Sequence, residues 1–191
     1  MSERKRTKTQ RAILHAAKVL YEKHGVGNVP FDDIAETAGV CRTTVFNHFA
    51  DAGELQQAIA VAEIAEIIEF GENSKLRGLP LIYALLDKLI DDTANYPRVM
   101  ARLANATILG GEGGRVSEIE RLIARHYEQE FGAALAQVRV TPALLSQMTL
   151  GIYYGQVNHQ LAYGLPFEAE QMHQDMRVML DLLLRGVRAG E

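Results

Sequence analysis

Apolar residues recur at intervals of three and four positions through most of the chain, as they do along one face of an α-helix. Gly25 and Gly39 interrupt this pattern, and Asp51 followed by Glu54 predicts the capped start of a long helix. The first four predicted helices cover residues 8–24, 32–38, 42–49 and 52 to about 71. No segment alternates apolar and polar residues convincingly enough to predict a β-strand.

Five further helices are predicted beyond Gly78, where proline and glycine divide the apolar pattern. They are a helix with Pro80 in its first turn, a short helix opened by Pro97, a long helix over residues 116–138, a helix from Pro142 to Gly164 and a last one from Pro166. The glycine run at residues 110–114 predicts a flexible connection. It lacks the lysine–serine ending of a phosphate-binding loop. The chain is therefore predicted to be all-α, with about nine helices.

The segment from Phe31 to Phe49 has the spacing of a helix-turn-helix. Ala35 is small enough for two helices to cross closely, Gly39 allows a left-handed turn between them, and Val40 can fill the corner. The second helix of such a motif enters the major groove of DNA with its outward side chains. In this chain the outward residues are polar and none is acidic: Arg42, Thr43, Thr44, Asn47 and His48.

Charge is distributed unevenly along the chain. The net charge is −4, which argues weakly against a protein that coats nucleic acid. Residues 1–55 nevertheless carry a net charge of +1, and four of their eight basic residues lie between Arg4 and Lys8. This pattern fits a basic arm that touches phosphate, and equally a solvated, disordered terminus.

Several spaced positions of this chain resemble the DNA-binding signature of the TetR family. They are Ile34-Ala35, Ala38-Gly39-Val40, Thr44, Phe46, His48-Phe49 and Leu55, preceded by Ile13-Leu14, Ala16-Ala17 and Gly25. The resemblance covers residues 7–60. It implies a three-helix DNA-binding domain at residues 1–52 and a larger helical domain for ligand binding and dimerisation at residues 53–191. It also implies a regulator, most often a repressor, that a small-molecule effector releases from a double-stranded DNA operator.

Carried over residue by residue, the resemblance implies that Arg42, Thr43, Thr44 and Asn47 face the groove. It also implies that Phe46 and His48 touch the sugar-phosphate backbone, with Thr7 and Lys8 adding phosphate contacts. The chain departs from the family pattern at three positions: Pro30 replaces a threonine cap, Cys41 a serine cap, and Ala52 a phosphate-contacting lysine. Losing one cationic contact lowers, by about one, the slope of the logarithm of DNA affinity against the logarithm of salt concentration.

Polar residues on otherwise apolar helices are candidates for lining an effector cavity in the second domain. They are Tyr96, Arg102, Asn105, His126, Tyr127, Tyr153 and Asn158. For His126 a hydrogen-bonded position in the core is the favoured alternative. Residues of the last two predicted helices are candidates for a homodimer interface, which two recognition helices at successive major grooves require. They are Gly151, Gly155, Met172, Met176, Met179 and Leu183, of which the methionines are more often core residues.

Other kinds of function find less support in the sequence. The six histidines lack metal-ligand spacing, and no nucleophile or metalloprotease motif is present, so we expect no enzyme, metal or cofactor. No apolar run is long enough to span a membrane, and the single cysteine fits a reducing cytoplasm. Cys41 is either a tolerated cap or an oxidation switch beside DNA. Two rivals remain: a DNA-binding protein without a small-molecule site, and an enzyme or carrier with a helix-turn-helix.

Overall fold

The computed structural model describes residues 3–102 and 113–188. In these ranges every regular element is a helix, as the sequence predicts. The helices are α1 (Glu3–His24), α2 (Phe31–Ala38), α3 (Arg42–His48), α4 (Ala52–Asn73), α5 (Gly78–Asn95), α7 (Gly113–Gln137), α8 (Pro142–Tyr163) and α9 (Ala169–Arg188). Residues 97–102 are helical as well. None of these helices has the length and apolarity that a membrane crossing requires.

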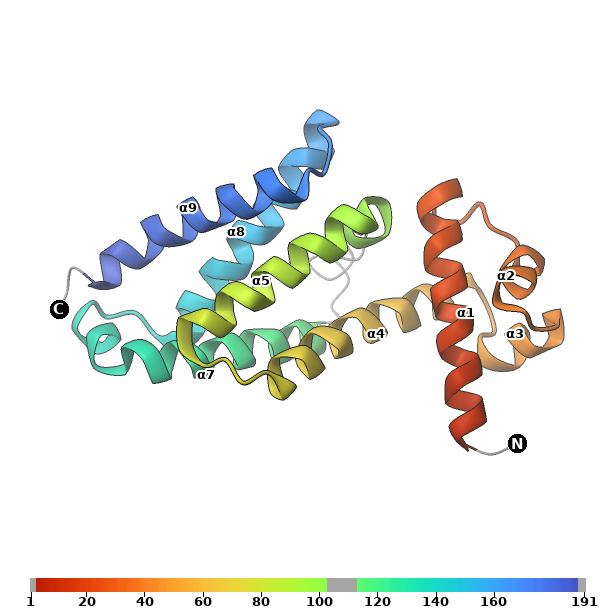
Figure 1. The fold of residues 1–191 in the computed structure, drawn as a ribbon, viewed down its shortest axis with the longest axis horizontal. Helices are drawn as coiled ribbons and strands as arrows, with labels where there is room; N and C mark the ends of the chain where they lie inside the picture. The colour runs from red at the N-terminus through yellow and green to blue at the C-terminus, as the bar shows by residue number, and fades with distance from the viewer. Residues whose placement is uncertain (1–2, 103–112, 189–191) are drawn as a thin grey trace.

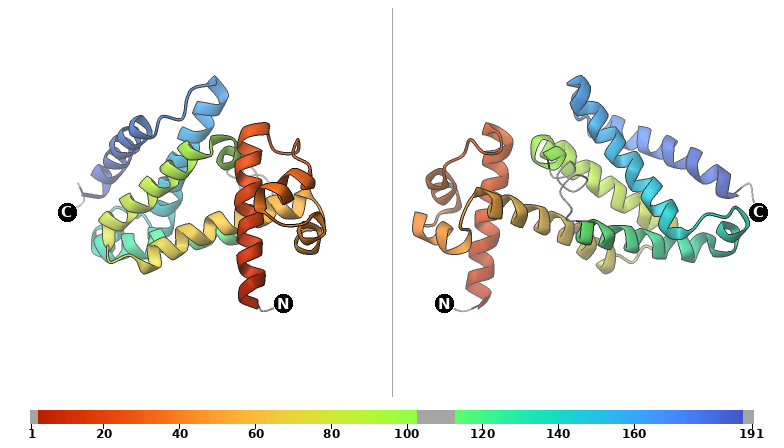
Figure 2. Two further views of the ribbon diagram at one scale, coloured as in Figure 1. Left: turned by 45° about the vertical axis from the view of Figure 1, so that its right-hand side comes forward. Right: turned by 180° about the vertical axis from the view of Figure 1, so that it is seen from behind.

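The helices form a small head and a larger body (Figures 1 and 2). We define the head as α1, α2 and α3, which lie together at one end of the molecule, and the body as α5, α7, α8 and α9. Helix α4 leaves the head and runs along the body beside α5 and α7. A movement of α4 would therefore change the position of the head relative to the body.

Local capping explains where several helices begin and end. The Asp51 carboxylate accepts the Glu54 N–H at 2.8 Å, and the Glu54 carboxylate accepts the Ala50 N–H at 2.6 Å. Thr141 caps α8 by accepting the Leu144 N–H at 3.1 Å, and Gly164, with φ 62°, ends the same helix. These caps confirm the predicted starts of α4 and α8.

Three predicted boundaries were wrong. Helix α1 begins at Glu3 rather than at Lys8, because residues 3–7 contain good helix formers and no breaker. The stretch that we expected to be an arm is thus the first part of α1. Helix α7 begins at Gly113, inside the glycine run, and α9 begins at Ala169 rather than at Pro166.

The structure has two hydrophobic cores, and the boundary between them lies along α4. The head core contains Ile13, Ile34 and Val45 together with Leu55 and Ile59 from the start of α4. The body core contains Ile67 of α4, with Ile64 and Ile68 packed against it, and the apolar faces of α5, α7, α8 and α9. The first two turns of α4 therefore pack with the head, beyond the boundary at residue 52 that the sequence suggested.

Polar contacts join α1 to α4 and to the segment after α5. The Lys18 ammonium contacts the Glu63 carboxylate at 2.7 Å, and each side chain is only 11% exposed. The same ammonium lies 4.1 Å from the centre of the Tyr96 ring. The Glu22 carboxylate accepts the N–H groups of Arg98 and Val99 at 2.9 and 3.2 Å. These contacts fix α1 to α4 and to the segment that follows α5.

Candidate nucleic-acid interface

The turn between α2 and α3 holds the two helices at a fixed angle. Gly39 adopts a left-handed conformation with φ 67°, which favours glycine at this position. Its N–H donates to the Glu36 carbonyl, and the Val40 N–H donates to the Ala35 carbonyl at 2.9 Å. Ile34 and Val45 are fully buried beneath the turn. This is the geometry that the sequence predicts for a helix-turn-helix.

Helix α3 presents one polar face to solvent. Arg42, Thr43, Phe46 and Asn47 are exposed, whereas Thr44 and His48 are half-buried. The structure thus brings six of the seven predicted DNA-binding residues onto one short helix. The seventh, Lys8, is exposed on α1.

Arg42 is already engaged within the head, which the sequence did not reveal. Its guanidinium contacts the Asp32 carboxylate of α2 at 2.7 Å and lies 5.4 Å from the centre of the Phe46 ring. The Phe46 ring in turn lies 4.9 Å from that of Phe31. Because Asp32 competes for the guanidinium, Arg42 must leave or share this carboxylate to contact a base or a phosphate. Only a contact map could identify Asp32, since its spacing of ten residues follows no helical repeat.

Cys41 lies at the N-terminal end of α3 and is exposed. Its Sγ lies 3.1 Å from Thr43 Oγ1 and 2.9 Å from Thr44 Oγ1. These hydroxyls, followed by the Thr44 backbone, lower the pKa of the Cys41 thiol to about 7. At neutral pH a large fraction of the side chain is therefore the reactive thiolate.

We predict that alkylation of Cys41 by iodoacetamide reaches half of its maximal rate near pH 7. The chain has one cysteine, so the modified mass measured over a pH series reports on this residue alone. The Thr43→Val and Thr44→Val double variant should shift the half-point toward the ordinary value of about 8.5, because it removes both hydroxyls. A wild-type half-point at 8.5 or above would contradict the prediction. The oxidation-switch hypothesis fails separately if Cys41→Ser releases DNA with peroxide as the wild type does.

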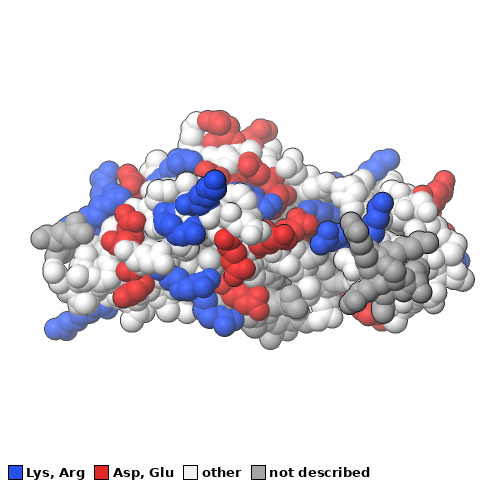
Figure 3. Space-filling model, turned by 60° about the horizontal axis from the view of Figure 1, so that its bottom comes forward, with Lys and Arg blue, Asp and Glu red and all other residues white. Residues whose placement is uncertain are grey.

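On the face drawn in Figure 3, charge does not by itself mark a DNA-binding surface. On the side drawn in Figure 3, acidic and basic side chains are interspersed along the molecule. The candidate interface on α3 is instead distinguished by exposed hydrogen-bonding groups and by the absence of acidic residues from the helix.

The predicted effector residues do not converge on one site. Tyr96 packs against the head core, Arg102 is exposed, and Asn158 is half-buried on α8. Asn105 lies outside the described residues. His126 is buried and its Nδ1 accepts the Gly78 N–H at 3.2 Å, as a hydrogen-bonded core histidine would. Burial, together with Arg77 and Arg125, lowers the pKa of His126, so its ring is neutral at pH 7.

Tyr127 and Tyr153 belong to hydroxyl pairs in the body core. The Tyr127 hydroxyl lies 2.7 Å from that of Thr149, and the Tyr153 hydroxyl lies 2.7 Å from that of Thr93. Each threonine hydroxyl donates to the backbone carbonyl four residues earlier, so each tyrosine must donate to its threonine. Both tyrosine oxygens therefore retain lone pairs that can accept another hydrogen bond.

A surface hollow of about 730 Å³ lies elsewhere, between α4, α7 and the start of α8. Ile68, Leu122 and Pro142 form part of its wall, beside charged residues such as Arg121 and Arg125. None of the six predicted effector residues that the structure describes lines this hollow.

The predicted dimer residues divide between the core and the surface. Met172 and Met176 are 0% and 1% exposed within a single chain, so our prediction that they face a partner was wrong. They lie on the α9 face that packs into the body core. Gly151 and Gly155 lie on the outer face of α8, and Met179 and Leu183 are half-buried. Helices α8 and α9 also leave apolar side chains exposed: Leu144, Met148, Val178 and Leu182.

Comparisons with known proteins agree with this geometry. The sequence model of the tetR family of bacterial regulatory proteins matches residues 13–59. No curated protein matches the chain by sequence.

Among solved structures, a TetR-family transcriptional regulator from Pectobacterium atrosepticum aligns with a TM-score of 0.70 and 16% identity, covering 98% of this chain and 97% of its own. NalD, the secondary repressor of the MexAB-OprM multidrug efflux pump in Pseudomonas aeruginosa, aligns with a TM-score of 0.59 and 22% identity over 94% and 96% of the two chains. SmeT, the repressor of the SmeDEF multidrug efflux pump of Stenotrophomonas maltophilia, aligns with a TM-score of 0.63 and 19% identity over 93% and 91%. A complex of SmeT with triclosan is also similar, with a TM-score of 0.65 and 17% identity over 93% and 90%.

At these identities the solved structures establish a shared fold, while the family model matches the helix-turn-helix itself. Residues 13–59 therefore match the sequence pattern of the tetR family of bacterial regulatory proteins, and the chain shares the fold of solved regulators described as members of that family.

Proposed function

We propose that this protein is a homodimeric transcriptional repressor that binds a DNA operator through α3 and leaves it when a small molecule binds the body. The observation that carries the proposal is the exposed, acid-free face of α3, held by a buried turn. Arg42, Thr43, Thr44 and Asn47 supply donors and acceptors for base edges. Phe46, His48 and Lys8 supply contacts to the sugar-phosphate backbone. Because the proposed partner is bacterial DNA, we expect the protein to act in the cytoplasm.

A second copy is needed because one α3 reads only a single half-site. The outer faces of α8 and α9 support a dimer, because exposed Leu144, Met148, Val178 and Leu182 would be covered there. Gly151 and Gly155 lie one turn apart on α8, and a Cβ added at either position would meet no atom of another described part of the chain within 4 Å. A partner helix could therefore approach this face closely. Met179 and Leu183 lie half-buried beside it.

The proposed effector enters the body core between α5, α7 and α8. Tyr127 and Tyr153 lie there among apolar side chains, and their oxygens can accept hydrogen bonds from a ligand. Burial raises the pKa of both hydroxyls, so the tyrosines remain neutral at every physiological pH. An apolar molecule with one or two hydrogen-bond donors fits this chemistry. The similarity to SmeT, which has been solved with triclosan, supports an effector of this kind.

Helix α4 links the effector site to DNA. Its first turns pack with the head core and its last turns with the body core, so we place the division between the two domains within α4. In this mechanism the effector favours a state in which the two copies of α3 are no longer spaced for successive major grooves.

The test is selection of binding sites from random duplex DNA by the purified chain, at two salt concentrations. A two-fold symmetric site that is lost with Thr44→Ala or Asn47→Ala would support sequence-specific regulation. An Asn73→Ala variant, which makes the same change as Asn47→Ala at an exposed position at the far end of α4, serves as the control. Recovery of only non-specific, steeply salt-dependent binding would overturn the proposal and favour an architectural protein. With an operator in hand, a screen in which no small molecule changes its affinity would overturn the effector mechanism.

A further inference from the structure

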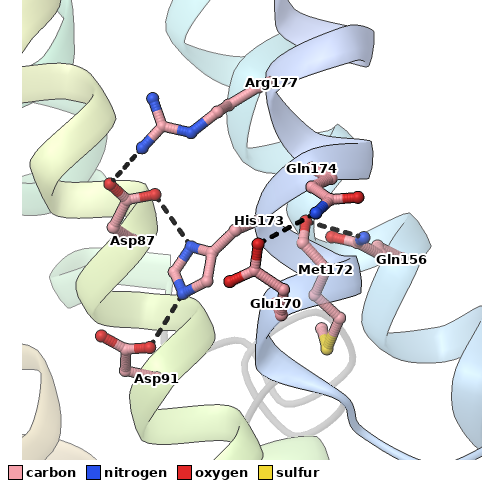
Figure 4. A network of polar contacts seen from close by, with 8 residues as sticks. All are labelled: Asp87, Asp91, Gln156, Glu170, Met172, His173, Gln174 and Arg177. Atoms are coloured by element: carbon pink, nitrogen blue, oxygen red, sulfur yellow. Dashed lines mark hydrogen bonds and ion pairs between the residues drawn. The ribbon is translucent and has the colours of Figure 1, made fainter.

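A histidine on α9 is held between two carboxylates of α5 (Figure 4). His173 Nδ1 lies 2.9 Å from Asp87 Oδ1, and His173 Nε2 lies 2.8 Å from Asp91 Oδ1. The His173 side chain is 19% exposed. Both ring nitrogens therefore meet a carboxylate at hydrogen-bonding distance.

This geometry specifies the charge of the ring. A carboxylate only accepts hydrogen bonds, so each of the two contacts requires an N–H on the imidazole. Neutral histidine has one N–H, and its other nitrogen would turn a lone pair toward a carboxylate oxygen. Only the imidazolium form satisfies Asp87 and Asp91 together.

The balance of charge around the ring leads to the same result. Arg177 of α9 contacts the other oxygen of Asp87 at 2.7 Å and lies over the Tyr83 ring of α5. With His173 protonated, two cations face two carboxylates, whereas loss of the proton leaves a net negative charge. On α9 Glu170 accepts a hydrogen bond from Gln174, and on α5 Lys88 pairs with Asp92. From α8 the neutral Gln156 donates to the Met172 carbonyl.

We propose that Asp87, Asp91, His173 and Arg177 form a proton-operated latch that fixes α9 on α5 and loosens when the imidazole loses its proton. Opposite this latch, α9 exposes Val178 and Leu182, which belong to the proposed dimer face. When the latch loosens, α9 no longer holds Val178 and Leu182 in one fixed position. Dimerisation therefore weakens as the pH rises. This last step rests on the proposed function, whereas the latch itself does not.

The direction of the effect follows from the ring's titration. Burial by itself would lower the pKa of His173, but the hydrogen bonds to Asp91 and Asp87 outweigh it and the pKa is raised above its ordinary value. A raised pKa in the folded state stabilises the protein below the unfolded-state value of about 6.5. That stabilisation is lost as the pH rises through the folded-state pKa. Each unit of elevation corresponds to about a tenfold change in the folding equilibrium constant.

The experiment uses the full chain and measures two quantities between pH 5.5 and 9. The first is the pKa of the His173 ring, followed by its proton resonances in wild type and in Asp91→Asn. The second is the urea midpoint of wild type, His173→Gln and His24→Gln. The last variant removes an exposed histidine outside the cluster and is the matched control. Analytical ultracentrifugation of the same proteins gives the dimer dissociation constant.

We expect a wild-type His173 pKa above 6.5 that falls in Asp91→Asn. The urea midpoint should decline with rising pH in wild type and in His24→Gln more steeply than in His173→Gln. A wild-type pKa at or below 6.5, or the same decline in His173→Gln, would overturn the latch. If the chain stays monomeric, the proposed dimer fails while the pKa and urea results still decide the latch. A dimer whose affinity ignores pH while the latch titrates would overturn only the coupling to dimerisation.

Discussion

Replacing Lys18 by methionine is expected to lower the free energy of unfolding by about 3–5 kcal/mol at pH 7.5. The ammonium lies 2.7 Å from the Glu63 carboxylate, and both side chains are 11% exposed. Methionine keeps most of the apolar stem but leaves the carboxylate buried without its cation. Urea denaturation of the purified variant measures the loss. A loss on this scale is a large fraction of the stability of a typical domain.

The matched control is Lys88→Met, which breaks the Lys88–Asp92 pair on α5. That pair is more exposed, at 24% and 22%, and is expected to contribute about 0.5 kcal/mol or less. The double variant Lys18→Met with Glu63→Leu should recover most of the stability, because no buried charge remains. Equal losses in Lys18→Met and Lys88→Met would show that the pair between α1 and α4 has no special role.

The loss in Lys18→Met should also depend on pH. Burial raises the pKa of Glu63, while the hydrogen bond and charge of Lys18 oppose the rise. Removing Lys18 raises this pKa further, so the folded variant takes up a proton more readily than the unfolded chain. The variant should therefore lose stability, relative to wild type, as the pH rises from the unfolded-state pKa of about 4.3 toward 8. A difference that stays constant across this range would contradict the buried-charge explanation.

Replacing Asn47 by aspartate is expected to weaken operator binding by about a hundredfold or more. The change keeps the size of the side chain but places a negative charge on the exposed face of α3, which we propose faces DNA. Like charges at an interface cost several kcal/mol, and about 1.4 kcal/mol corresponds to a factor of ten in affinity. Fluorescence anisotropy with the selected operator, at constant salt, measures the dissociation constant.

Asn73→Asp provides the matched control for this prediction. It makes the same chemical change at an exposed position at the far end of α4. Its operator affinity should stay within a factor of about three of wild type, because that site is remote from the head and its charge is screened by salt. If Asn47→Asp binds as tightly as Asn73→Asp, α3 does not read the groove in the proposed orientation.

The sequence by itself determined the helix-turn-helix and the all-α fold. A helix needs only local information: apolar residues at a period of 3.6, a cap such as Asp51 or Thr141, and a glycine at a left-handed turn such as Gly39. Each of these signals lies within a few residues of the feature that it specifies. For this reason the position of α3 and its exposed polar side chains could be predicted before its coordinates were known.

Tertiary structure alone decided which apolar faces turn inward and which distant charges meet. Met172 and Leu182 both look like residues of an apolar helix, yet only the packing of α9 on the body buries the first and exposes the second. The contacts of Arg42 with Asp32, Lys18 with Glu63, and His173 with Asp87 join residues on different helices. Such pairs depend on how helices cross, and no periodic pattern within one helix encodes the position of its neighbour.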